Sequence, residues 1–351
     1  MIHAGTDGTW VGGTTQVGWM QGKDCTFIGA LESALAPTAC PYSYTDLMGY
    51  SGLAFRTRWF QNPEAGETPW GTQRWHPISP HGEGPDELAA LSTATGWRFR
   101  REDLPQDRND PAYQHLITDL VLSVNAGLPA VIGLNTDLAT VYGYHIWSMN
   151  LVVRDYQRPD QENVRTQAND PGFQSPVAFL ERHEDPPEPR EALLATLALA
   201  ARNADRELSG GFQYGLAALR TWHDDLVGHD TYTDAERNLL FLANWWSLMH
   251  LVDARESAVA FLEANADLLT GASQTALLQA LDSYKQEARL LRQFADEHLD
   301  FIQWYGGTKQ ATAWDPPTRQ SQADLLAKAA ELETDALKAC EEVLATAGKQ
   351  P

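Results

Sequence analysis

Residues 21–37 read QGKDCTFIGALESALAP, a stretch that predicts a buried helix beginning at a cysteine. Apolar side chains recur in it at three- and four-residue spacing, which is typical of a helix with one buried face. These side chains are Phe27, Ile28, Leu31 and Leu35. Pro37 ends the helix, and Asp24 is a candidate N-cap, which would leave Cys25 in the first helical turn.

Cys25 has two interpretations at this position. The positive end of a helix dipole lowers the pKa of a thiol from about 8.5 toward neutrality, which raises the fraction of reactive thiolate. The negative charge of Asp24 opposes this effect. Alternatively, Cys25 is a small apolar core residue, because free cysteine is among the most buried residue types. Position alone favours the core interpretation, so the decision depends on whether a base lies near the thiol.

A nucleophilic cysteine needs a base within hydrogen-bond reach and a group that orients this base. The best placed of the ten histidines is His145 in VYGYHIWSMNLVVRD (141–155), which lies between two predicted strands. Asp155 or Asp170 could orient its imidazole, and Gln21 could bind an oxyanion together with the Cys25 N–H. A histidine in an aromatic turn is also a common structural hydrogen-bonding group, and this alternative stays open.

Size and charge limit the class of protein. A chain of 351 residues with 43% hydrophobic content can build two cores, because single cores stop growing beyond roughly 250 residues. Lys and Arg total 26 against 47 Asp and Glu, a net charge of −21. Such a charge repels phosphate backbones and anionic lipids, so we expect neither nucleic acid nor a membrane as partner. It would suit a basic peptide or an amine.

The N-terminal stretch, the apolar segments and the cysteines predict the compartment and the cofactors. The N-terminal stretch MIHAGTDGTWVGGTTQ lacks a signal-peptide pattern, and no later segment approaches the roughly 18 apolar residues of a membrane span, which predicts a cytoplasmic protein. Cys25, Cys40 and Cys340 show no CxxC spacing, so neither a disulfide framework nor a zinc site is expected. We expect no metal and no cofactor.

A change in composition marks a domain boundary near residue 185. Apolar runs at 128–134, 150–156 and 177–181 read as strands, and DPAYQHLITDLVLSVNAG (110–127) reads as a helix capped by glycine. The proline-rich HEDPPEPREA (183–192) then reads as a linker. Helical periodicity dominates the remainder. Helices are expected at 189–208, 210–227, 234–269, 273–304 and 320–347. The prediction is an α+β domain at 1–185 followed by an all-α bundle at 186–351.

Several of these segments resemble the papain-like cysteine-protease superfamily. The similar motifs are DCTFIGALESAL, YSYTDLMGYSGLAFRTRW, AGLPAVIGL, VYGYH and DYQ. The nearest resemblance is to the branch of the butirosin biosynthesis protein H N-terminal domain and the bacteriocin leader peptidases, which often carry a helical domain. It implies a helix with the nucleophile at its start, Cys25 here, packed on an antiparallel sheet that carries the base.

The position of the base depends on the register of the match. In the active peptidases the histidine opens a strand about six residues before the glycine of a Gly-Tyr-Asp-like turn. If GYH (143–145) matches that turn, the base position falls near Asp137 and the base is missing. If His145 instead opens the strand IWSMNLVVRDY, the triad is Cys25, His145 and Asp170. We favour the second register.

Two functions follow from the resemblance. One is a thiol enzyme in peptide or natural-product biosynthesis, an acyltransferase or an amidase or peptidase, acting on a peptide, an amine or a carrier-protein-bound acyl group. The other is an inactive papain-like protein that binds a peptide or small molecule between its two domains. Residues flanking the site are candidates for substrate contacts. These are Trp19, Asp24, Trp75 and Tyr144. A homo-oligomer is compatible with either function.

A second histidine cluster lies in WHPISPHGEGPDE (75–87). His76, His81 and Glu83 could hold a metal only with a further ligand from elsewhere in the chain. The proline and glycine content favours a surface loop near the mouth of the site instead.

Overall fold

The structure is a computed structural model that describes residues 1–60, 86–135, 137–159, 161, 164–204, 212–298 and 314–348. It combines helices with an antiparallel sheet, which confirms the α+β class. Two compact units form, one of Met1–Ser51 with Ser79–Pro187 and one of Gly52–Ile78 with Glu188–Pro351. The sequence had placed the boundary between residues 185 and 186. Among the described residues, Gly52–Phe60 differs from that division, because this segment groups with the helices that follow residue 188.

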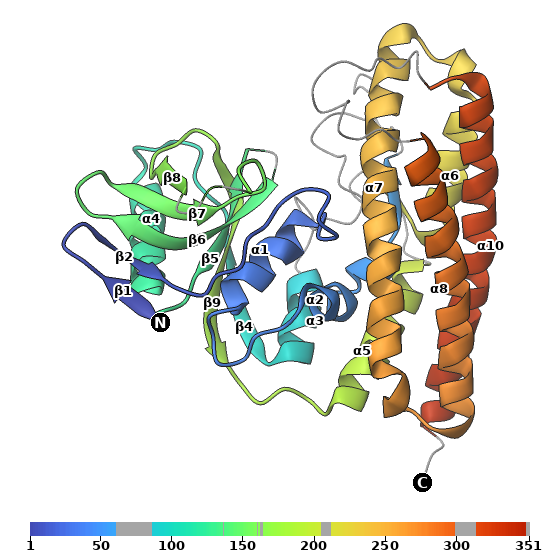
Figure 1. The fold of residues 1–351 in the computed structure, drawn as a ribbon, viewed down its shortest axis with the longest axis horizontal. Coiled ribbons are helices and arrows are strands. Elements are labelled where there is room, and N and C mark those ends of the chain that lie inside the picture. Colours follow the sequence, from blue (N-terminus) through green and yellow to red (C-terminus); the bar gives the residue numbers. More distant parts are fainter. Residues whose placement is uncertain are drawn as a thin grey trace. The chain divides into compact units, whose positions relative to one another are not determined.

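The first unit is built on an antiparallel sheet in the order β1-β2-β6-β5-β9-β4, with β7 and β8 continuing from β6 (Figure 1). The strands are β1 (Ile2–Ala4), β2 (Gly8–Val11), β4 (Trp97–Glu102), β5 (Ala130–Leu134), β6 (Asp137–His145), β7 (Asn150–Arg154), β8 (Val164–Gln167) and β9 (Phe173–His183). Strands β5, β7 and β9 confirm the strands expected from the apolar runs. The long central strand β6 was not predicted.

Strand β6 was not predicted because buried and exposed residues do not alternate along it. Seven consecutive residues from Asp137 to Gly143 are buried, so both faces of the strand are covered and the period-2 signal of a half-exposed strand is lost. β6 also contains Ala139 and Gly143, which are weak strand formers. Its pairing with β5, β7 and β2 fixes the position of every residue along it.

Two helices cover the two faces of this sheet. Helix α1 (Thr26–Leu35) packs on β5 and β6, where the Thr140 hydroxyl donates to the Ala30 carbonyl at 2.7 Å. Helix α4 (Pro111–Asn125) packs on the opposite face, in a core cluster that includes Ala139 and Val141 of β6. Figure 1 shows the two helices on different sides of the strands. Alternate residues of β6 therefore serve alternate helices. The described part of this unit also contains the helices α2 (Tyr44–Tyr50) and α3 (Asp86–Thr95).

The second unit is a bundle of long helices. Helices α7, α8 and α10 pack side by side, with α6 against α10 (Figure 1). The helices are α5 (Pro189–Ala204), α6 (Gly215–Val227), α7 (Asp234–Asn265), α8 (Gly271–His298) and α10 (Pro316–Ala347). They confirm the expected helices over 189–204, 215–227, 234–265, 273–298 and 320–347, whereas residues 212–214, expected at the start of a helix, form a strand. A small two-stranded antiparallel sheet of β3 (Arg58–Phe60) and β10 (Phe212–Tyr214) packs on α6. Among the described helices of the chain, none has the length and apolar character needed to cross a bilayer.

Candidate functional site

The N-terminus of α1 begins one residue later than the sequence suggested. Cys25, with φ −77° and ψ 97°, is itself the N-cap, and its side chain makes no capping hydrogen bond. The expectation that Asp24 caps the helix is wrong, because its carboxylate accepts from the Met20 N–H at 2.7 Å and so closes the preceding loop. The thiol therefore stands at the helix entrance and is fully buried.

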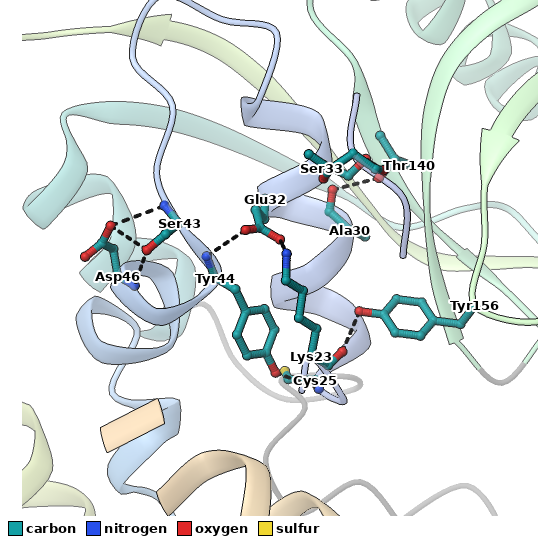
Figure 2. A network of polar contacts seen from close by, with 11 residues as sticks. Lys23, Cys25, Ala30, Glu32, Ser33, Ser43, Tyr44, Asp46, Thr140 and Tyr156 are labelled. Atoms are coloured by element: carbon teal, nitrogen blue, oxygen red, sulfur yellow. Dashed lines mark hydrogen bonds and ion pairs between the residues drawn. The ribbon is translucent and has the colours of Figure 1, made fainter. Parts of the chain in front are cut away.

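The backbone N–H of Cys25 is already engaged. It donates to the Tyr44 hydroxyl at 2.9 Å, and Tyr44 is itself buried at the start of α2. Glu32 holds this arrangement in place, because its carboxylate accepts from the Tyr44 N–H at 3.0 Å and pairs with the Lys23 ammonium. Figure 2 shows the Tyr44 ring aimed at the start of α1. The donor that would bind an oxyanion beside Cys25 is thus occupied by a phenol.

A second tyrosine fixes the loop before Cys25 from the other side. Tyr156, which follows β7, donates its hydroxyl to the Lys23 carbonyl at 2.7 Å (Figure 2). The ring lies 5.2 Å from that of Trp19, centroid to centroid. Its hydroxyl also lies directly over Gly29 on the first full turn of α1. Trp19 therefore supports the loop through Tyr156.

The start of β6 lies beside the start of α1. The Leu138 N–H donates to the Thr26 hydroxyl at 3.3 Å, which brings Asp137, the first residue of the strand, next to the helix N-terminus. Asp137 is buried, and its carboxylate accepts from the Gln157 side-chain amide at 2.5 Å. The first residue of β6, near the helix entrance, is therefore a buried aspartate.

Asp155 anchors the loop that supplies Gln157. Its buried carboxylate accepts from the Gln157 and Arg158 N–H groups, both at 2.9 Å, and binds the Arg158 guanidinium through Nε at 2.9 Å and Nη2 at 2.6 Å. These four bonds use the carboxylate fully. Asp155 orients the loop that bears Gln157, rather than an imidazole.

The structure does not bring His145 to Cys25. His145 is the last residue of β6 and pairs with Gly8 of β2 and Asn150 of β7. Seven residues of extended strand separate it from Leu138, or roughly 23 Å at about 3.3 Å per residue. The second register, with His145 as the base, is therefore wrong. The physical reason is that residues 137–145 form one continuous strand, whose opposite ends cannot share a site.

The remaining predicted residues have other partners. The Asp170 carboxylate accepts from the Gly172 N–H at 2.7 Å within the turn before β9. Gln21 is exposed, and its amide lies against Gly18. The Tyr144 hydroxyl donates to Asn125 of α4 at 2.9 Å, on the face of the sheet away from α1. None of these three contacts reaches Cys25. Trp75 and the cluster of His76, His81 and Glu83 lie outside the described residues.

His145 instead lines a hollow at its own end of β6. This hollow measures about 340 Å³. Its lining residues are Gly5, Thr6, Asp7, Gly8, Trp10, His145 and Val152. It therefore combines an exposed carboxylate, Asp7, with the ring of Trp10. The following hairpin presents Trp147, which is 80% exposed and donates its indole N–H to the Thr6 carbonyl at 3.1 Å.

Comparison with protein-family models and with curated proteins returns no match. The residues that sequence reasoning missed around Cys25 are Tyr44 and Gln157, although both lie in the YSYTDL and DYQ motifs that carried the resemblance. Neither motif reveals that a phenol takes the Cys25 N–H or that an amide faces Asp137, because these contacts join segments 19 and 20 residues apart in sequence.

Proposed function

We propose that this chain is a papain-like protein in which Cys25 does not act as a nucleophile, and that it functions by binding a peptide or a small amine. The support for a papain-like first unit is a helix with a cysteine at its start, packed on an antiparallel sheet. The support for inactivity is a set of contacts around that cysteine.

Asp137 at the start of β6 is the observation that carries the proposal. A thiol is activated by a neutral imidazole, which accepts its proton and then stabilises the thiolate as a cation. A carboxylate in the same position would instead place two negative charges side by side, which disfavours the thiolate. The Tyr44 hydroxyl adds to this effect, because it occupies the Cys25 N–H that would otherwise stabilise an oxyanion.

Alkylation of Cys25 by iodoacetamide tests this inactivity. We expect the folded full-length chain to react at Cys25 at least tenfold more slowly between pH 6 and 8 than the same thiol in the urea-unfolded chain, because the thiol is fully buried. Peptide mapping identifies the modified cysteine, and Cys25→Ser provides the background. Asp137→Asn should leave this low rate unchanged within twofold.

Asp103→Asn is the matched control, because Asp103 is an aspartate of the same unit whose side chain is 80% exposed. The opposite outcome would identify a thiol enzyme with a carboxylate base: rapid alkylation of Cys25 near neutral pH that falls at least tenfold in Asp137→Asn and not in Asp103→Asn. Acyl transfer and amide hydrolysis would then be the reactions to assay.

The hollow beside His145 supports a cationic group as the ligand. A carboxylate and an indole ring together favour an ammonium or guanidinium, and the net charge of −21 attracts such a group over a longer range. An exposed cation–π contact and an exposed ion pair each contribute about 0.5–1 kcal/mol. Losing either one should therefore weaken binding by about two- to fivefold.

N-acetyl-lysine methylamide tests this ligand class, with N-acetyl-norleucine methylamide as an uncharged probe of the same length. We expect chemical-shift titration to detect the lysine probe at the Trp10 indole and the Gly8 amide, and the Gly8 amide to report weaker binding in Asp7→Asn and Trp10→Ala but not in Asp103→Asn. Equal binding of the two probes, or no effect of Asp7→Asn, would exclude a cation site in this hollow.

A further inference from the structure

A second cysteine, Cys40, lies beside a histidine. Its sulfur is 3.7 Å from Nδ1 of His183, a hydrogen-bond distance for sulfur. Cys40 follows α1, and His183 is the last residue of β9, so the pair joins segments 143 residues apart. Both residues are partly exposed. The pair therefore differs from Cys25, which is fully buried at the other end of the same helix.

The contacts of His183 determine which ring nitrogen carries its proton. Nε2 lies 3.1 Å from the Thr95 carbonyl oxygen, which also accepts from the Tyr42 hydroxyl at 2.9 Å. A carbonyl oxygen only accepts, so Nε2 must be the protonated nitrogen of the neutral ring. Nδ1 then presents its lone pair to the Cys40 thiol. This is the arrangement in which an imidazole can take the thiol proton.

Buried neighbouring residues hold Cys40 and His183 in position. Thr95 is fully buried at the end of α3, so its carbonyl is a fixed point for the imidazole. The Trp97 indole N–H donates to the Cys40 carbonyl at 2.9 Å, and the Trp97 ring meets the His183 ring edge-on at 5.4 Å between centroids. One tryptophan thus positions both members of the pair. The Thr95 carbonyl and Trp97 thus supply the orientation of the base that an activated thiol requires.

We propose that Cys40 and His183 form a reactive thiol pair that undergoes thiol–disulfide exchange with a low-molecular-weight disulfide. The Cys40 proton moves to His183 Nδ1, and the thiolate attacks one sulfur of the disulfide. A new S–S bond forms to Cys40 as the old one breaks, and the departing thiolate takes the proton back from His183. Cys40 ends oxidised as a mixed disulfide, and one equivalent of small thiol is released.

Disulfide exchange is the reaction that this geometry fits. It requires a thiolate, a proton acceptor and access, and it does not require oxyanion donors as acyl transfer does. The imidazolium formed after proton transfer keeps its Nε2–H hydrogen bond to the Thr95 carbonyl. This inference concerns a different site from Cys25 and the hollow, and does not rest on the function proposed for them.

Bis(2-hydroxyethyl) disulfide is a suitable neutral probe, and the measurement is the rate of mixed-disulfide formation at each cysteine by peptide mapping between pH 5.5 and 9. We expect Cys40 to react first, and Cys25 and Cys340 at least tenfold more slowly because both are fully buried. The rate at Cys40 at pH 6 should stay within fivefold of the rate at pH 8. In His183→Gln the rate at pH 6 should fall at least tenfold.

His115→Gln is the matched control, because His115 is 79% exposed on the same unit, and it should behave as the parent chain. A second comparison needs no variant: the urea-unfolded parent chain gives the pH profile of the same thiol without its partner. The proposal is overturned if Cys40 in the folded chain follows the unfolded profile, or if His183→Gln reacts like the parent at pH 6. Reaction at Cys25 ahead of Cys40 would also overturn it, and would contradict the proposed inactivity of Cys25 separately.

Discussion

At the scale of single residues, the conformation of the loop before Cys25 depends on a glycine in α1, Gly29. Gly29 lies on α1 directly beneath the Tyr156 hydroxyl, which binds the Lys23 carbonyl. A Cβ atom at Gly29 would overlap that hydroxyl. The hydroxyl cannot withdraw without giving up its hydrogen bond, because Tyr156 is also fully buried. The glycine is therefore required by close packing and not by its backbone angles.

Gly29→Ala should lower the free energy of unfolding of the first unit by about 1–3 kcal/mol, the usual cost of overpacking a core. Urea unfolding followed by tryptophan fluorescence measures this change. Gly5→Ala is the control in the same unit, since its Cβ would meet nothing closer than 3.9 Å. If Gly29→Ala were as stable as Gly5→Ala, the packing of Tyr156 on α1 would not contribute to stability.

The residues around Cys25 differ in whether their positions could be predicted from the sequence. The burial of the face of α1 could be predicted, because apolar spacing reports it directly. The end of β6 that lies near the start of α1 could not be predicted, because the strand from Asp137 to Gly143 is buried on both faces. Because polar and apolar residues do not alternate along β6, its sequence does not reveal which residues pair with the neighbouring strands. Only its pairing with β5 and β7 in the structure fixes which end lies against α1.

At the scale of elements, side chains at a helix N-terminus stabilise the helix by capping its free N–H groups. Helix α7 begins with a capping box in which the Thr233 hydroxyl accepts from the Glu236 N–H, and the Glu236 carboxylate accepts from the Thr233 N–H at 2.8 Å. Hydrogen bonds from Thr233 lower the pKa of Glu236. The bundle helices themselves were predicted from their apolar periodicity, to within about five residues at their described ends. The two-stranded sheet of β3 and β10 was not predictable, because its strands lie about 150 residues apart and each spans three residues.

Thr233→Ala should destabilise the second unit by about 1 kcal/mol, because it removes the acceptor for an N–H at the helix start. Thr221→Ala on α6 is the control: its hydroxyl donates to the Ala217 carbonyl within the helix, and alanine there is neutral or favourable. Urea denaturation followed by circular dichroism compares the two variants. Equal stability would show that the capping box of α7 does not limit the stability of the bundle.

At the scale of the whole molecule, the second unit contains a buried ionic cluster. Arg255 of α7 is fully buried and binds Glu287 of α8 through Nε at 3.0 Å, and its Nη2 contacts Glu333 of α10. It also donates to the Ala54 carbonyl at 3.0 Å and to the Thr57 hydroxyl. One guanidinium therefore joins three long helices to the segment after α2. It offsets only one of two buried carboxylate charges.

This imbalance predicts a pH dependence of stability. Burial outweighs the attraction of Arg255 and raises the pKa of Glu287 from 4.5 to about 7. The folded chain then holds a proton that the unfolded chain releases between these values, so the free energy of unfolding falls as pH rises from about 4.5 to about 7, by on the order of 3 kcal/mol.

Glu287→Gln cannot titrate, so its stability relative to the parent should rise by that amount over this interval. Urea unfolding at several pH values measures the difference. Glu256→Gln, which removes a half-exposed partner of Arg292, should change by less than about 1 kcal/mol. A difference between Glu287→Gln and the parent that does not vary with pH would mean that Glu287 is ionised in the folded bundle, and that Arg255 balances both carboxylates.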